Sequence, residues 1–321
     1  MKALRFEHQQ LTVAEVDAPR AGAEALVRVT LSGVCNTDLE IARGYAGFQG
    51  TLGHEFVGVV EAAPEASSSW VGQRVVGEIN AGCGRCALCV AGDPRHCPRR
   101  TVLGIVGRDG AHAEFLRLPV ANLLTVPDDI PDERAVFAEP LAAACGVTER
   151  IQIEKGTSVA VVGDGKLGLL CAQAVRAQTG ADVTLVGKHP SKLAVATRRG
   201  VETVLLDQLH DAPARQFDVV VEASGAAPGF ALALDLLCPR GTLVLKSTFH
   251  GRTALDAARV VVNEISVIGS RCGRFRPALE LLRRDAVDVE SLISEEFPLA
   301  EGVRAMERAG EGGVLKVLLR P

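Results

Sequence analysis

Segments typical of strands and of helices alternate between residues 156 and 269 of the chain. Residues 158–162 (Ser-Val-Ala-Val-Val) are typical of a buried strand, and residues 166–178 of the helix that follows it. Further strands are predicted at 182–186, 203–206, 217–222, 241–246 and 266–269, and further helices at 191–199 and 228–237. Strands and helices that alternate at this spacing form a parallel sheet with helices on both faces. The pattern therefore predicts a doubly wound α/β domain.

A glycine-rich turn separates the first predicted strand and helix of this domain. It reads Gly-Asp-Gly-Lys-Leu-Gly at residues 163–168, the G-x-G-x-x-G pattern of dinucleotide-binding folds. The first glycine allows a tight turn, the second lets the backbone approach a pyrophosphate, and the third lets the helix pack on the strand. The alternative is a glycine-rich turn without a ligand. We predict a Rossmann dinucleotide site with the loop residues Gly163, Gly165, Lys166, Leu167 and Gly168.

The end of the second predicted strand bears on which dinucleotide binds. NAD sites usually place an acidic residue there, which accepts the ribose hydroxyls. Asp182 precedes this strand and so lies at its wrong end. The strand ends instead at Gly187 and Lys188, and Lys192 follows. Space beside a glycine and nearby cations suit a 2′-phosphate, so we predict that NADP(H) is preferred and that NAD(H) is possible. Alternatively, both lysines are ordinary surface residues and NAD binds.

The first third of the chain has a different pattern of apolar and polar residues. Short alternating runs are punctuated by Gly and Pro, as in a β-rich domain. They lie at residues 1–6, 26–34, 56–62 and 74–77. After residue 276 the chain adds two helices and a last strand at 314–319. We predict two domains, a β-rich catalytic one formed by residues 1–140 and 271–321 and a dinucleotide-binding one formed by residues 141–270.

Four cysteines follow a C-x2-C-x2-C-x7-C spacing, at Cys83, Cys86, Cys89 and Cys97. Thiols so close on a short loop can converge on one tetrahedral zinc, and four sulfurs with no open position are typical of a structural site. The surrounding lobe, residues 80–99, is too polar and too rich in Gly and Pro to form a core of its own. The alternatives are two disulfides or four free thiols. We predict a structural zinc that holds this lobe together.

Cys35 and His54 lie in the β-rich domain, outside the cysteine lobe. They could share a second zinc, with a carboxylate from Glu55 or from Glu139 as a further ligand. Taken singly, a buried histidine is more often a hydrogen-bonded core residue, and a lone cysteine a small hydrophobic one. From these residues alone, both interpretations stay open.

The composition argues against several classes of partner. A net charge of −4 and a pI near 6.0 do not suit a nucleic-acid-binding protein, which needs a basic face. No apolar run reaches the ~18 residues of a membrane span, and the N-terminus lacks the apolar core of a signal peptide. Nine cysteines without a secretion signal fit a reducing compartment. We expect a soluble, cytoplasmic protein.

Six segments carry a resemblance to a known family. They are G-V-C-N-T-D at 33–38, G-H-E-F-V-G at 53–58, the four cysteines, A-E-P-L at 138–141, G-D-G-K-L-G at 163–168 and G-V-L-K-V at 313–317. In these segments, in their order and over essentially its whole length, the chain resembles the zinc-containing medium-chain dehydrogenase/reductase family of the alcohol, sorbitol and threonine dehydrogenase type. The resemblance implies a GroES-like β-rich domain beside the Rossmann domain.

The resemblance also implies a ligand set for the second metal. Cys35 and His54 match the catalytic zinc ligands of the family. Glu139 falls where the family places a third protein ligand or a carboxylate close to the metal. Glu55 matches a nearby acid that is sometimes a ligand itself.

Other site residues follow from the same resemblance. Thr37 matches the hydroxyl that relays the alcohol proton, and Asp38 matches the carboxylate that orients the histidine. We also assign Gly269, Ser270 and Lys316 to the cofactor-binding residues.

The predicted function is that of a zinc-dependent oxidoreductase. It would transfer hydride between a nicotinamide cofactor and an alcohol or carbonyl substrate of the polyol, sugar or amino-alcohol type, with two Zn²⁺ per chain, in a homodimer or homotetramer. Three alternatives stay open: an enoyl-type reductase that acts on the C=C bond of a thioester or enone, a non-catalytic nucleotide-binding protein, and a zinc-dependent structural protein.

Overall fold

The chain folds into two compact units in a computed structural model that describes residues 1–20, 22–210, 216–248 and 254–321. The first unit combines Met1–Glu139 with Ile293–Pro321, and the second is Pro140–Leu292. The chain was expected to return to the first unit near residue 271. It returns later because the segment before Ile293 is bound to the second unit: Gln173 Oε1 accepts the backbone N–H of Asp288 at 2.7 Å, and Arg198 pairs with the Asp288 carboxylate at 3.0 Å.

Strands dominate the first unit. They are β1 (Lys2–Glu7), β2 (Gln10–Glu15), β3 (Ala25–Gly33), β4 (Gly50–Thr51), β5 (Glu55–Ala62), β6 (Arg74–Gly77), β7 (Asn80–Ala81), β8 (Thr101–Val102), β9 (Phe115–Leu118), β10 (Leu123–Thr125), β17 (Ile293–Pro298) and β18 (Lys316–Arg320). Its helices are α1 (Asn36–Ala42), α2 (Ala87–Val90), α3 (Asp132–Ala135) and α10 (Gly302–Ala309), and α4 (Ala138–Arg150) begins in it. In β3 the apolar residues alternate, and Val27, Val29 and Leu31 are buried, as in a strand that packs one face on a core.

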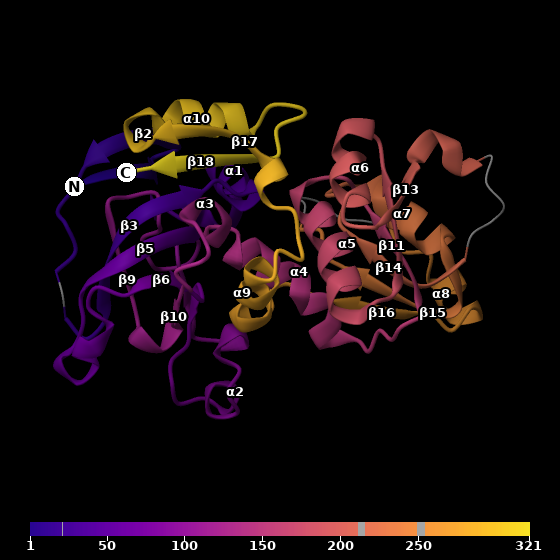
Figure 1. The fold of residues 1–321 in the computed structure, drawn as a ribbon, viewed down its shortest axis with the longest axis horizontal. Helices are drawn as coiled ribbons and strands as arrows, with labels where there is room; N and C mark the ends of the chain where they lie inside the picture. The colour runs from indigo at the N-terminus through magenta and orange to yellow at the C-terminus, as the bar shows by residue number, and fades with distance from the viewer. Residues whose placement is uncertain (21, 211–215, 249–253) are drawn as a thin grey trace. The chain divides into compact units, whose positions relative to one another are not determined.

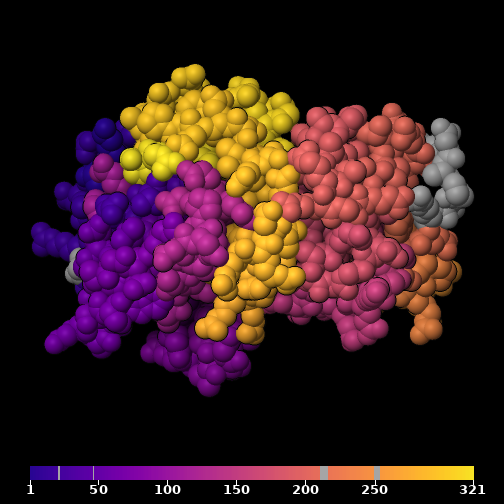
Figure 2. Space-filling model, viewed as in Figure 1, coloured from indigo at the N-terminus to yellow at the C-terminus, as the bar shows by residue number. Residues whose placement is uncertain are grey.

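A seven-stranded sheet carries the site of the first unit. Its strand order is β10-β6-β5-β3-β18-β17, and β9 also pairs with β3. The last strand of the chain thus lies beside one from its beginning, and Figures 1 and 2 show the yellow C-terminal residues against indigo and violet ones. Gly33 at the end of β3 faces Glu55 of β5 on one side and Leu318 of β18 on the other. The end of β3 therefore meets the start of β5 and the middle of β18.

Helix α1 is held by the hydrophobic core beneath it. Ile41 of α1 is fully buried in a cluster with Leu4, Met306 and Leu319. Burying a side chain of this size contributes roughly 1.5–3 kcal/mol. Because the N-cap of α1 is Cys35, this packing also fixes the position of the Cys35 thiol.

The second unit alternates strands and helices. Its strands are β11 (Ser158–Val162), β12 (Asp182–Gly187), β13 (Glu202–Leu205), β14 (Phe217–Glu222), β15 (Leu237–Leu245) and β16 (Ser266–Gly269). Its helices are most of α4, then α5 (Lys166–Thr179), α6 (Pro190–Thr197), α7 (Ala227–Asp235), α8 (Ala257–Val262) and α9 (Phe275–Arg283). The strands are parallel in the order β13-β12-β11-β14-β15-β16. The order reverses beside β11, so right-handed crossovers put helices on both faces. The predicted doubly wound sheet is confirmed.

Several elements were not predicted, among them β17 and α8. Strand β17 has the sequence Ile-Ser-Glu-Glu-Phe-Pro and lies at the edge of its sheet with only Phe297 buried, so it lacks the apolar alternation of a central strand. Helix α8 carries Val261 and Val262, which are 74% and 79% exposed, on a short segment without helical periodicity. In the described ranges, no helix is long and apolar enough to cross a membrane.

Candidate active site and metal centres

Three potential metal ligands meet where β3 ends and β5 begins. Cys35 follows β3, His54 immediately precedes β5, and Glu55 is the first residue of β5. One ligand atom of each lies within 4.8 Å of those of the other two. His54 and Glu55 are only 3% and 1% exposed. The register of the two strands thus brings Cys35 next to His54 and Glu55, which come nineteen and twenty positions later in the sequence.

The donor set fits a zinc ion. Glu55 pairs through Oε2 with the Lys316 ammonium, while its buried Oε1 has no hydrogen-bond partner among the described residues. A buried acceptor without a partner costs about 1–3 kcal/mol, which ligation of a cation would offset. A thiolate, an imidazole and a carboxylate are zinc ligands, and three protein ligands leave one position open, as in catalytic sites.

A carboxylate lies behind His54. Asp38 is fully buried, and its Oδ1 is 3.4 Å from Nδ1 of His54. Its oxygens also accept the backbone N–H groups of Cys35 at 2.8 Å and Gly53 at 3.2 Å. Burial by itself would raise the pKa of Asp38, but the His54 and His112 imidazoles hold it well below its usual range. An ionised carboxylate on the Nδ1 side leaves Nε2 of His54 for a metal.

Thr37 and Glu139 lie near this cluster. Thr37 Oγ1 is 3.8 Å from Cys35 Sγ, and its side chain is half-buried. Glu139 lies in the first turn of α4 and outside the three-ligand cluster. Burial and the negative charges of Glu55 and Glu78 raise the pKa of Glu139 to about 7, against the opposing effect of His54. The structure therefore groups Glu55, and not Glu139, with Cys35 and His54.

Lys316 belongs to this region as well. It is 1% exposed, and besides Glu55 its ammonium contacts the Val34 carbonyl at 3.2 Å and lies 5.6 Å from the ring centre of Phe137. We assigned Lys316 to the cofactor from the sequence. The structure pairs its ammonium with Glu55 of the three-ligand cluster, because β18 pairs with the end of β3.

The cysteine lobe brings its four thiols together. Their sulfurs all lie within 4.8 Å of one another, with Cys86 at 3.5 Å from Cys89 and 3.7 Å from Cys97. Tetrahedral zinc with Zn–S bonds of about 2.3 Å requires sulfurs about 3.8 Å apart. Hydrogen bonds from the backbone of Arg85 and from Arg99 lower the pKa of Cys83 to about 5, which favours its thiolate. None of the four is in a disulfide within the described part of the chain. Geometry and donors fit a closed zinc site.

The glycine-rich loop has the geometry that its pattern predicts. Gly163 has φ +118°, and a Cβ on Gly168 would overlap the Gly163 carbonyl. Gly165 is the N-cap of α5, and no described atom lies within 4 Å of the place its Cβ would take. Lys166 and Leu167, half-buried, open the helix. The N-terminus of a 14-residue helix thus faces open space, which suits a pyrophosphate.

A carboxylate does lie at the end of β12, but it comes from the glycine loop. Asp164 Oδ2 accepts the backbone N–H groups of Lys188 and His189, both at 2.7 Å. Gly187 was expected to leave room for a phosphate; a Cβ there would come within 2.6 Å of Asp164, so this space is filled. Lys188 is exposed and Lys192 half-buried.

The last predicted cofactor residues lie at the end of β16. No described atom is within 4 Å of the Cβ position of Gly269, whereas Ser270 is buried, with Oγ 3.4 Å from Lys246 Nζ. Sequence analysis missed Lys246, a buried lysine that also donates to the Ala143 carbonyl at 2.6 Å. Its position directly after an apolar strand was the signal, since ligands of open α/β sheets bind at the carboxyl ends of strands.

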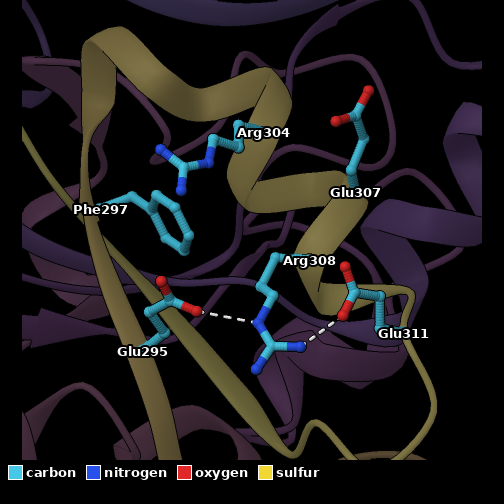
Figure 3. A pocket seen from close by; sticks show the side chains of 6 residues that line it. All are labelled: Glu295, Phe297, Arg304, Glu307, Arg308 and Glu311. Carbon is cyan, nitrogen blue, oxygen red and sulfur yellow. Dashed lines mark hydrogen bonds and ion pairs between the residues drawn. The ribbon is translucent and has the colours of Figure 1, made fainter.

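A surface hollow on the first unit holds none of the predicted residues. Figure 3 shows Arg304 and Arg308 of α10 beside Phe297 and Glu295 of β17. Arg308 pairs with Glu295 at 2.8 Å and with Glu311, and Arg304 stacks on Phe297. Both guanidinium groups, those of Arg304 and Arg308, are thus already in contact with neighbouring side chains.

Comparisons with known proteins agree with this architecture. Residues 21–128 match the family described as "Alcohol dehydrogenase GroES-like domain", and residues 167–284 match "Zinc-binding dehydrogenase". Sorbitol dehydrogenase of Halalkalibacterium halodurans is 31% identical, with 100% of this chain and 99% of that protein covered. L-threonine 3-dehydrogenase of Sinorhizobium medicae is also 31% identical, over 95% of this chain and 94% of that protein.

A solved structure extends the likeness to three dimensions. A putative zinc-binding dehydrogenase from Sinorhizobium meliloti 1021, bound to NADP, superimposes with a TM-score of 0.90 at 30% identity, over 100% of this chain and 99% of that one. Sequence identity at this level over complete chains, together with the ligand cluster and the doubly wound sheet, leads to one conclusion. The chain belongs to the zinc-containing medium-chain dehydrogenase family, whose members are nicotinamide-dependent oxidoreductases.

Proposed function

We propose that this dehydrogenase interconverts a secondary alcohol and a carbonyl in a small polyol, sugar or amino alcohol, at an open zinc site formed by Cys35, His54 and Glu55. The observation that carries the proposal is the buried Glu55 Oε1, which has no hydrogen-bond partner among the described residues and lies in a cluster with the other two ligand atoms. The named relatives act on a polyol and on an amino alcohol, which supports this substrate class.

The residues of the chain would hold the reacting groups and move a proton. A zinc in this cluster would supply Lewis acidity to the substrate oxygen, and a bound nicotinamide would carry the hydride. Thr37 Oγ1, near Cys35 Sγ, would take the hydroxyl proton of the substrate and pass it toward solvent. Asp38 holds the His54 ring, and Lys316 holds Glu55 by one oxygen so that the other faces the cluster. Glu139 lies within electrostatic range of His54 and Glu55, and it would accept a hydrogen bond from a water molecule near the site.

The second zinc would be structural. Cys83, Cys86, Cys89 and Cys97 offer four sulfurs and no open position, so this ion would stabilise the lobe without contacting substrate. Two Zn²⁺ per chain are therefore proposed.

For the cofactor we retain NADP(H) as the preferred form, with NAD(H) accepted. The exposed Lys188 and the half-buried Lys192 supply positive charge near the end of β12, and a 30% identical protein has NADP bound. Asp164 opposes this preference with a negative charge at the same place. We expect the balance to favour the phosphate only modestly.

A homodimer or homotetramer is proposed on the basis of one edge of the second unit. Strand β16 ends the parallel sheet, and Val267 in it is 40% exposed. Leu255, Val261 and Val262 are 52–79% exposed in the same part of the chain. Apolar residues gathered at a sheet edge are typical of an interface between subunits. The cytoplasmic location stays a prediction.

A substrate panel tests the proposed function. The zinc-loaded enzyme would be assayed with polyols, sugars, amino alcohols, aldehydes and an α,β-unsaturated thioester, each with both nicotinamides. We expect turnover of at least one alcohol–carbonyl pair, and its loss in Cys35→Ser with a native circular dichroism spectrum. Turnover of only the unsaturated thioester would contradict the proposal.

A further inference from the structure

A second imidazole lies on the far side of the carboxylate that orients His54. The Asp38 carboxylate has His54 Nδ1 at 3.4 Å from Oδ1 and His112 Nε2 at 3.5 Å from Oδ2. Both side chains of this second pair, Asp38 and His112, are fully buried. His112 was not singled out in the sequence, and no step of the proposed reaction uses it.

The structure holds His112 rigidly in this place. Its backbone N–H donates to the Leu52 carbonyl at 2.9 Å, and its own carbonyl accepts from Leu4 at 2.8 Å. Gly53 has φ +95°, and a Cβ there would lie 2.6 Å from the His112 ring. Gly53, the residue just before His54, therefore leaves the space that the His112 ring fills.

A buried hydroxyl is the partner of the other nitrogen of the His112 ring. Ser32 Oγ lies 2.9 Å from Nδ1 of His112, and Ser32 is fully buried. A hydroxyl can donate to Nδ1, and the ring then carries its proton on Nε2, the atom that faces Asp38. Nε2 has no hydrogen-bond partner among the described residues, and it faces Oδ2 of Asp38 at an ion-pair distance of 3.5 Å. Ser32, His112, Asp38 and His54 therefore follow one another at 2.9, 3.5 and 3.4 Å, in a buried polar series that ends at a proposed metal ligand.

We propose that His112 is a positioning residue for the catalytic zinc. Its Nε2–H anchors Oδ2 of Asp38, so that Oδ1 stays aimed at Nδ1 of His54 and Nε2 of His54 stays available to the metal. The inference rests on the proposed open zinc site. Partners of ligand histidines typically change metal affinity by about 10- to 100-fold, and a residue one step further out acts through the same orientation.

Three variants test this role. His112→Phe keeps a flat ring but removes both nitrogens, His112→Gln keeps an N–H donor near the Nε2 position, and Ser32→Ala removes the hydroxyl that fixes the tautomer. The control is His8→Phe, the same replacement at an exposed turn of the first unit. Zinc retention would be measured by competition with a chromogenic chelator, and ligand geometry by the visible absorption of the Co²⁺-substituted protein.

The inference predicts different results for the two sites. In His112→Phe, the open site should lose zinc about tenfold more readily and its Co²⁺ bands should shift, while the four-cysteine site keeps its zinc. His112→Gln should keep most of the zinc retention of the wild type. The zinc retention of Ser32→Ala should lie between those of His112→Phe and the wild type. Wild-type retention and spectra in both His112→Phe and Ser32→Ala would overturn the role. If His112→Phe does not fold, equal retention in wild type and Ser32→Ala overturns it.

The proposed function can fail separately. Wild-type protein that binds a single zinc, unaffected by Cys35→Ser, would overturn the open metal site and this inference with it. Two zincs in the wild type with no effect of the His112 changes would overturn only the positioning role.

Discussion

The Asp164 carboxylate lies 2.9 Å from Nδ1 of His189 and accepts the backbone N–H of the same residue at 2.7 Å. His189 is the N-cap of α6, so the acid occupies backbone donors at a helix start that would otherwise be free for an anion. Burial alone would raise the pKa of Asp164, but its bonds to His189 and Lys188 lower it, so the group is charged near neutral pH. A negative charge therefore lies at the end of β12, where dinucleotide-binding folds usually distinguish NAD from NADP.

Replacing Asp164 by Asn should shift cofactor choice toward NADPH. The amide keeps an acceptor for the backbone but removes the charge that repels a 2′-phosphate. A unit charge at several Å contributes a few kcal/mol at most, so we expect the NADPH/NADH affinity ratio to rise about tenfold. Fluorescence titration with each reduced cofactor measures this. Asp182→Asn, at the opposite end of β12, is the matched control. An unchanged ratio in D164N would remove Asp164 from cofactor selection.

Serine replacements should separate the two proposed zinc sites. Cys35→Ser should lower the zinc content from two ions to one and abolish turnover, while the unfolding midpoint changes little. Cys89→Ser should also cost one zinc, but it should lower the yield of soluble protein and expose residues 80–99 to protease. The lobe has no core of its own: none of the residues in α2 is buried. Plasma emission spectrometry and limited proteolysis give the two readouts.

Equal zinc loss and equal protease sensitivity in the two variants would contradict this division of roles. Cys238→Ser, at a half-buried cysteine of the second unit, controls for loss of a thiol as such.

Replacing Glu139 by Gln tests whether this acid serves the open site. The carboxylate lies within electrostatic range of His54 and Glu55 but outside their cluster, so we expect turnover to fall about tenfold or more while both zincs remain bound. Steady-state kinetics and metal analysis of the same preparation measure the two effects. Glu154→Gln, at an exposed acid, is the control. Wild-type kinetics would leave Glu139 as a helix N-terminal acid favoured by the dipole of α4.

Asp288 should give the second unit a pH-dependent share of its stability. Burial opposes ionisation of this acid, but the Ser291 backbone N–H and Arg198 lower its pKa below the usual value. A carboxylate whose pKa is depressed in the native state stabilises above its unfolded pKa, and this contribution is lost as the pH falls through the native pKa. Asp288→Asn should therefore lower the free energy of unfolding by about 1–2 kcal/mol at pH 7 and by little near pH 3.

Hydrogen exchange of peptides from residues 140–292 would measure that difference. Asp285→Asn is the matched control, since Asp285 pairs with Arg199 in the same segment but its side chain is 62% exposed. An exposed pair contributes below about 1 kcal/mol, so this variant should change little at either pH. An Asp288 effect of equal size at pH 3 and pH 7 would contradict the assigned cause.

The parallel sheet could be predicted from the sequence, because each of its strands is a short apolar run closed by Gly or by a charged residue. Strands β11, β14 and β16 have the predicted limits. The fold of the first unit was harder to predict from the sequence, since its sheet joins strands from both ends of the chain and no local pattern indicates that pairing. Strand β17 has two glutamates at its centre, so it carries no apolar pattern from which a strand could be predicted.

The residues of the candidate site likewise divide into those that the sequence could predict and those that it could not. Cys35, His54 and the four cysteines could be named because their residue types and spacings are distinctive. Asp164 was overlooked as a carboxylate at the end of β12, because it comes from a loop 24 positions before Lys188 and only the fold joins them. The pairing of Lys316 with Glu55 was missed for a related reason, since a lysine in the final strand gives no sign that it will be buried against that acid. His112 follows a Gly-Ala pair and belongs to no motif.

The path of the chain through the first unit sets an order for biosynthesis. Strand β18 supplies Lys316 to the ligand cluster and pairs with β3, yet the whole of the second unit lies between them in the sequence. During translation, the ribosome must finish the dinucleotide-binding unit before the sheet next to Cys35 can close. Domains generally fold as they emerge, so the nascent N-terminal segment waits with an unpaired edge at β3 while the second unit folds. Zinc captured in that interval would be held without the Lys316–Glu55 pair, and a ribosome stalled after residue 292 would carry a folded second unit beside an incomplete metal site.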